Sequence, residues 1–144
     1  MLANPASLCF IDSNLWLYAM LPQQDQQKEV HANQLITRNR DKIIISTQVI
    51  NEITNNLLRK GNFTEHAIRM TIRSLYHDFQ VIPMSKAIQE RASELREKLS
   101  LSHYDGLILA AALLSNVTIL YSEDMHNGLI VEGQLTIVNP FASQ

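Results

Sequence analysis

Short apolar segments that suit β-strands alternate along this chain with longer segments of helical periodicity. The strand candidates are residues 8–11, 42–46, 81–83 and 117–121, with a possible fifth at 135–138. Unbroken β-branched runs such as Ile43-Ile44-Ile45 are typical of strands buried on both faces, as in parallel sheets. Strands that are separated by helices throughout therefore predict an α/β fold with a mostly parallel sheet of four or five strands.

Helices are expected over residues 14–20, 24–37, 47–60, 64–78, 85–99 and 105–115. In the fourth of these, Ile68, Ile72, Leu75 and Tyr76, followed by Phe79, recur at a spacing that predicts an inward face. Hydroxyl side chains precede several of the helices and are candidate N-caps, at Ser46 or Thr47, Ser85 and Ser102.

The size and composition of the chain suit one compact domain over residues 1–144, with no room for a second. Cys9 is the only cysteine and lies in an apolar run, so it is interpreted as a small core residue in a reducing compartment. No basic leader or long apolar segment is present, so we expect a soluble, cytoplasmic protein that does not associate with a membrane. The net charge of −2 shows no basic excess of the kind common in nucleic-acid binders.

Four acidic residues are predicted to share one edge of the sheet. Asp12 ends the first strand, Glu52 lies early in the helix after the second, Asp105 lies in the first turn of its helix, and Asp124 follows the strand at 117–121. Ligands bind at this carboxyl edge in open α/β sheets. Gathered carboxylates repel one another unless they share protons or hold a cation, and oxygen-only ligands indicate Mg²⁺ or Mn²⁺.

Each acid also has an ordinary structural explanation. Asp105 matches a capping box with Ser102, Asp12 could cap the helix that follows it, Glu52 could be a solvated side chain, and Asp124 could be a loop residue. Four separate structural roles would place all four acids on one edge only by chance, so a shared site is the better explanation. A phosphatase of the haloacid dehalogenase class is excluded, since it needs a second Asp at the position of Asn14.

Several ordered motifs resemble those of the PIN-domain nucleases, and most closely the VapC-type toxins of toxin–antitoxin pairs. The motifs are Phe10-Ile11-Asp12-Ser13-Asn14, the segment from Ser46 to Glu52, Leu101-Ser102-His103-Tyr104-Asp105 with its alanine-rich helix, Tyr121-Ser122-Glu123-Asp124-Met125 and Val138-Asn139-Pro140-Phe141. No single motif is specific, but their order is. The resemblance implies a PIN-like three-layer α/β/α fold.

By position, the resemblance implies that Asp12, Glu52, Asp105 and Asp124 form the catalytic metal site, with Asn14 and Ser122 in support. In the motif from Tyr121 to Met125, Asp124 is favoured over Glu123 as the metal-facing acid. His103 is interpreted as a helix-start residue. The resemblance also implies an Mg²⁺- or Mn²⁺-dependent endoribonuclease, with tRNA as the family-level substrate, a homodimer and a small antitoxin that blocks the site.

Basic side chains that could contact RNA phosphates are Arg38, Arg40, Lys42, Arg59, Lys60, Arg69 and Arg73. If the four acids belong to one metal site, the rest of the chain carries −2 + 4 = +2, which permits a polyanionic substrate. The alternative from another class is a catalytically silent PIN domain that acts as an RNA- or protein-binding module.

Overall fold

The structure, a computed structural model, describes residues 7–22 and 25–142 and contains a six-stranded central sheet. The strands are β1 (Cys9–Ile11), β2 (Ile43–Ser46), β3 (Gln80–Ile82), β4 (Ile119–Tyr121), β5 (Ile130–Val131) and β6 (Leu135–Val138), in the order β3-β2-β1-β4-β6-β5. All neighbours pair in parallel except β5 and β6. The predicted α/β class and mostly parallel sheet are confirmed, and β5 is an antiparallel edge strand that the sequence analysis missed.

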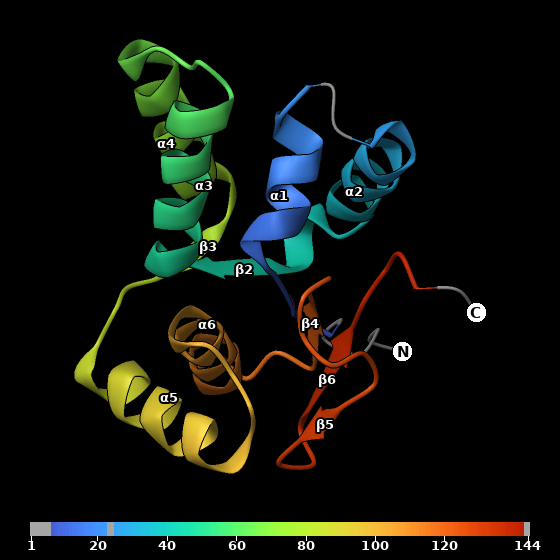
Figure 1. Cartoon of the computed structure of the whole chain (residues 1–144), viewed down its shortest axis with the longest axis vertical. Helices are drawn as coiled ribbons and strands as arrows, with labels where there is room; N and C mark the ends of the chain where they lie inside the picture. The colour runs from blue at the N-terminus through green and yellow to red at the C-terminus, as the bar shows by residue number, and fades with distance from the viewer. Residues whose placement is uncertain (1–6, 23–24, 143–144) are drawn as a thin grey trace, which may run out of the picture.

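Helices cover both faces of the sheet (Figure 1). They are α1 (Ser13–Met20), α2 (Gln26–Arg38), α3 (Thr47–Lys60), α4 (Glu65–Asp78), α5 (Lys86–Lys98) and α6 (His103–Leu114), with a short 3₁₀ helix, η1 (Arg40–Lys42), before β2. In Figure 1 the helices α1 to α4 lie above β2, and the pair α5 and α6 lies below it. The predicted start of the second helix, residue 24, lies outside the described residues. Within the described ranges, no helix is long and apolar enough to cross a membrane.

Hydroxyl side chains begin four of the helices. The side-chain oxygens of Ser46, Thr64, Ser85 and Ser102 accept hydrogen bonds from the backbone N–H groups three residues later, at 3.3, 3.1, 3.2 and 3.1 Å. Each bond satisfies one of the N–H groups that a first helical turn leaves without a partner. These local signals explain why the helix starts follow the sequence so closely.

The core lies between the sheet and the apolar sides of the helices. Helix α6 is the most deeply placed, since every residue from Gly106 to Leu113 is buried. On α4, however, the prediction that Tyr76 faces inward is wrong, because its side chain is 51% exposed. Leu75, which was also predicted to face inward, is buried, and Tyr76 is turned about 100° further round the helix.

The parallel register brings several loops to one edge of the sheet. Ile11 at the end of β1 pairs with Tyr121 at the end of β4, and the backbone N–H of Asp12 donates to the Tyr121 carbonyl at 3.0 Å. The next residue after β4, Ser122, donates its N–H to Val138 at the end of β6, also at 3.0 Å. Residues 12 and 122 therefore leave the sheet side by side.

Candidate functional site

Asp12 is a buried carboxylate held by short bonds from two neighbours. Its side chain is 3% exposed, Oδ1 accepts from the backbone N–H of Ser13 at 2.7 Å, and Oδ2 accepts from the hydroxyl of Ser122 at 2.8 Å. Burial raises the pKa of Asp12 to about 7 against the opposing effect of these bonds, and the charges of Glu52 and Asp105 add to the rise. Ionising the Asp12 carboxyl group therefore costs free energy unless a positive charge lies beside it.

Glu52 lies in the second turn of α3 and reaches toward Asp12. Its Oε1 accepts from the hydroxyl of Ser13 at 2.6 Å, and its Oε2 accepts from the amide of Gln48 at 3.0 Å. The Ser13 hydroxyl also lies 3.4 Å from Oδ1 of Asp12. Ser13 thus bridges the first two acids.

Asp105 lies in the first turn of α6, on the same edge. Burial raises its pKa, Ser102 opposes the rise, and the charges of Asp124 and Glu52 add to it. Of the two bonds of a capping box, the described contacts show one, from the Asp105 N–H to Ser102. Asp105 therefore lies near enough to Asp12, Glu52 and Asp124 for their charges to act on one another.

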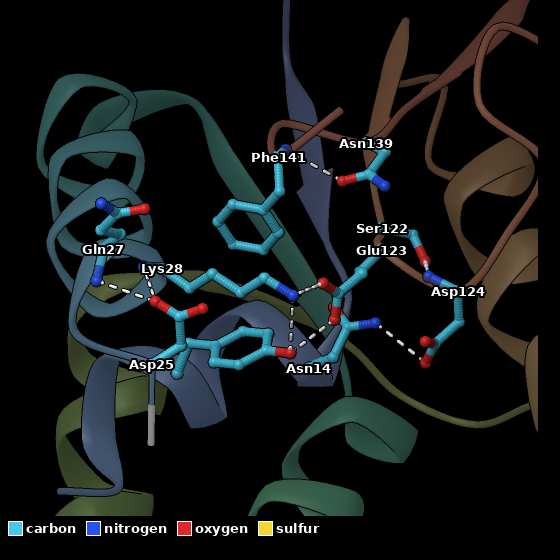
Figure 2. A network of polar contacts seen from close by, with 10 residues as sticks. Asn14, Asp25, Gln27, Lys28, Ser122, Glu123, Asp124, Asn139 and Phe141 are labelled. Atoms are coloured by element: carbon cyan, nitrogen blue, oxygen red, sulfur yellow. Dashed lines mark hydrogen bonds and ion pairs between the residues drawn. The ribbon is translucent and has the colours of Figure 1, made fainter. Parts of the chain in front are cut away.

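Asp124 and Glu123 point in different directions, as Figure 2 shows. The Asp124 N–H donates to Ser122 at 3.3 Å, and its Oδ2 accepts from the amide of Asn14 at 3.0 Å. Glu123 turns away and is bound by the Tyr18 hydroxyl at 2.6 Å and by the Lys28 ammonium. The geometry therefore favours Asp124 over Glu123 as the fourth acid of the site.

The donor chemistry of this edge fits a hard divalent cation. All four acids offer oxygen ligands, and Oδ1 of Asn14 is buried without a hydrogen-bond partner among the described residues. Within residues 7–22 and 25–142, no three His, Cys, Asp or Glu side chains converge closely enough to hold an ion as they stand. Three of the carboxylates instead accept hydrogen bonds from the side chains of Ser13, Ser122, Asn14 and Gln48, so coordination of one ion by the four acids would require side-chain rotations.

The candidate RNA-contact residues lie in two places. Arg38 ends α2, and Arg40 and Lys42 lie in η1, so all three precede the amino end of β2, away from the acid edge. Arg40 pairs with Asp78 at 2.7 Å. The others are exposed on the helix pair that carries Glu52, with Arg59 and Lys60 at the end of α3, and Arg69 and Arg73 on α4. In the described part of the chain, none of these seven forms an ion pair with the four acids.

Four polar residues around the acids were not predicted: Ser13, Tyr18, Lys28 and Gln48. Ser13 was identifiable in principle, because it lies between two predicted site residues. Gln48 lies one turn before Glu52 on α3, a spacing at which side chains meet. Tyr18 and Lys28 reach Glu123, next to Asp124, through the packing of α1 and α2, for which the sequence carries no local signal.

Comparisons with known proteins agree with this architecture. The profile of the family described as PIN domain matches residues 9–126. A search of curated protein sequences finds no match.

Solved structures with this fold include a toxin–antitoxin complex and a toxin. A toxin–antitoxin complex from Klebsiella pneumoniae is 22% identical at a TM-score of 0.70, covering 92% of this chain and 98% of the other. VapC20 of Mycobacterium tuberculosis, a sarcin–ricin-loop-cleaving toxin, is 18% identical at a TM-score of 0.68, with 81% and 89% covered. FitAcB from Neisseria gonorrhoeae is 13% identical at a TM-score of 0.63, with 93% and 99% covered. At these identities the likeness shows the fold.

Proposed function

This chain belongs to the PIN-domain family, and from that premise we propose that it is a divalent-metal-dependent endoribonuclease, the toxin of a VapBC-type toxin–antitoxin pair. One observation carries the proposal, namely the gathering of Asp12, Glu52, Asp105 and Asp124 at one edge of the sheet. Burial raises the pKa values of Asp12 and Asp105, and the charges of the neighbouring acids add to the rise. A cation would oppose this rise, since it favours the ionised form of every carboxylate around it.

In the proposed site, Asp12, Glu52, Asp105 and Asp124 bind Mg²⁺ or Mn²⁺. Such an ion, when bound, polarises a phosphodiester and lowers the pKa of a water molecule. The residues of the chain supply the geometry. Ser122 orients Asp12, and Ser13 orients Glu52. Asn14 binds Asp124 through its amide nitrogen, and its own Oδ1, buried without a hydrogen-bond partner among the described residues, is a further oxygen that could serve as a ligand or accept from a water molecule.

The proposed reaction is hydrolysis, in which water adds to phosphorus and the bond to the 3′ oxygen breaks. The products are a 5′-phosphate and a 3′-hydroxyl. Water is the nucleophile, so no serine or histidine nucleophile is needed. Cys9 is not suited to that role either, because burial raises the pKa of its thiol to about 11.

An exposed aromatic pair beside Asp105 suits a single-stranded RNA substrate. Tyr104 is 57% exposed in the first turn of α6, and the ring of His103 meets it edge-on at 5.0 Å between centroids. Unpaired bases stack on exposed aromatic rings, whereas bases inside a duplex cannot. We therefore propose a looped or unpaired RNA segment as the substrate, with tRNA as the first RNA to test.

A small antitoxin and a second copy of the chain are the proposed partners. Support for the antitoxin comes from structural neighbours that are toxin–antitoxin complexes, including one from Klebsiella pneumoniae. The homodimer rests on the family resemblance. Co-expression with a neighbouring short open reading frame, followed by light scattering of the purified complex, tests both.

Product analysis tests the proposed reaction. Purified protein is incubated with a tRNA mixture and Mg²⁺ or Mn²⁺, and the ends of the products are identified by ligation-dependent sequencing. New 5′-phosphate ends at a few positions support the proposal. Specific binding of RNA without new ends would favour the catalytically silent PIN domain.

A further inference from the structure

The turn that carries Asp124 is tied to the helix pair α1 and α2 by a second set of contacts. Tyr18 on α1 and Lys28 on α2 both bind Glu123. Phe141 from the C-terminal segment packs over Lys28, as Figure 2 shows. We refer to Tyr18, Lys28, Glu123 and Phe141 as the clamp. We propose that the clamp is a positioning device that fixes the direction of Asp124, and that Lys28 is its central residue.

The clamp uses both oxygens of Glu123. The Tyr18 hydroxyl donates to Oε1 at 2.6 Å, while the Lys28 ammonium pairs with Oε2 and donates to the Tyr18 oxygen at 3.4 Å. The Lys28 nitrogen also lies 5.1 Å from the centre of the Tyr18 ring and 5.3 Å from that of Phe141. Such a network is more restrictive than an isolated exposed ion pair.

Aromatic rings shield the ion pair from solvent. The rings of Tyr18 and Phe141 meet edge-on with their centroids 5.4 Å apart, and the Lys28 and Glu123 side chains are 31% and 21% exposed. The bond to Glu123 raises the pKa of Lys28, so the ammonium stays charged. A partly desolvated pair holds its geometry more strongly than a solvated pair.

Three consecutive side chains in this turn point to three different partners. Ser122 donates to Asp12, Glu123 is held by the clamp, and Asp124 faces Asn14. Because Glu123 precedes Asp124 directly, holding its side chain on the far side of the turn fixes the direction in which Asp124 leaves the backbone. The clamp also keeps Glu123, a fifth carboxylate, out of the site.

The direction in which cation affinity changes in a Lys28 variant distinguishes a positioning role of Lys28 from a purely electrostatic one. Substituting Lys28→Met removes a positive charge near the acids, so electrostatics alone predicts tighter binding of a cation. Positioning predicts weaker binding, because Asp124 loses its fixed direction. This inference rests on the proposed metal site, and the wild-type protein reports on that site separately.

The experiment is Mn²⁺ titration by calorimetry of wild-type protein and variants whose folding is verified by circular dichroism. We expect Lys28→Met to weaken Mn²⁺ binding about tenfold and Tyr18→Phe about threefold, with Lys28→Arg within about threefold of wild type. Lys86→Met is the matched control, since Lys86 pairs only weakly with Glu90 on the exposed side of α5. It should leave the affinity unchanged.

The outcomes are distinguishable. Wild-type protein without Mn²⁺ affinity would contradict the proposed metal site itself. Unchanged or tighter binding by Lys28→Met would overturn the clamp while leaving the site intact. If Lys28→Met fails to fold, Tyr18→Phe decides, and its unchanged affinity would overturn the clamp.

Discussion

The hydroxyl of Ser122 donates a 2.8 Å hydrogen bond to Oδ2 of Asp12, and both residues are buried. The same oxygen of Ser122 accepts the N–H of Asp124 at 3.3 Å. One side chain therefore connects the first acid of the site to the last. It also opposes the rise in the pKa of Asp12 that burial causes.

Removing that hydroxyl should lower the stability of the fold. Ser122→Ala leaves Asp12 without one of its donors, and the expected cost is about 1 to 3 kcal/mol of unfolding free energy. Urea denaturation measures the cost. Ser93→Ala on the exposed side of α5 is the control and should be neutral. A neutral Ser122→Ala would mean that water replaces the hydroxyl at no cost.

Stability without added cation should depend on pH through Asp12. The pKa of Asp12 is about 7 in the folded state and about 3.8 when unfolded, so between these values the folded chain binds the extra proton. Stability therefore falls as pH rises from about 4 to about 7, by on the order of 4 kcal/mol at most, and is level above that range.

The Asp12→Asn variant should remove this part of the pH dependence, because it cannot ionise. Thermal unfolding in the presence of a chelator, at about pH 5 and about pH 8, makes the comparison. We expect the variant to have a higher melting temperature than wild type at the higher pH. An equal change in melting temperature between the two pH values in both proteins would mean that a group other than Asp12 titrates.

A divalent cation should reverse the destabilisation. With Mn²⁺ at about a hundred times its dissociation constant, wild-type protein should gain about 2.7 kcal/mol, seen as a higher melting temperature at about pH 8. Asp12→Asn should gain much less, since it lacks one ligand charge. An equal gain in both proteins would indicate cation binding away from Asp12.

RNA binding should depend on the exposed ring of Tyr104. Tyr104→Ala is expected to weaken the binding of single-stranded RNA about tenfold, from the loss of one stacked base. Fluorescence anisotropy in the presence of a chelator measures binding without cleavage. Tyr76→Ala is the matched control, because Tyr76 is exposed to a similar extent on α4. An equal loss in both variants would argue against a defined stacking position.

The sequence alone predicted the parallel sheet and the shared edge of the acids, because both follow from local patterns. Apolar runs such as Ile43-Ile44-Ile45 form strands, and in a parallel sheet their following residues meet at one edge. The helix starts could also be predicted from local sequence, because Ser85 and Ser102 cap the turns that follow them.

Other features depend on packing between distant segments. Strand β5 has two residues, too few for a periodic pattern, and pairs only through its turn with β6. Tyr76 matched a helical stripe, yet Leu75 beside it filled the available inward position. The contact of Lys28 with Glu123 joins residues 95 positions apart, and no local pattern reports such a distance.

The most direct test of the proposed function is RNA cleavage by purified wild-type protein, Asp12→Asn and Asp105→Asn, all folded and all supplied with Mn²⁺. The proposed function predicts that wild type cleaves tRNA and that each variant loses at least about a hundredfold in rate, because each loses a carboxylate of the metal site. Equal residual cleavage by all three proteins would contradict it.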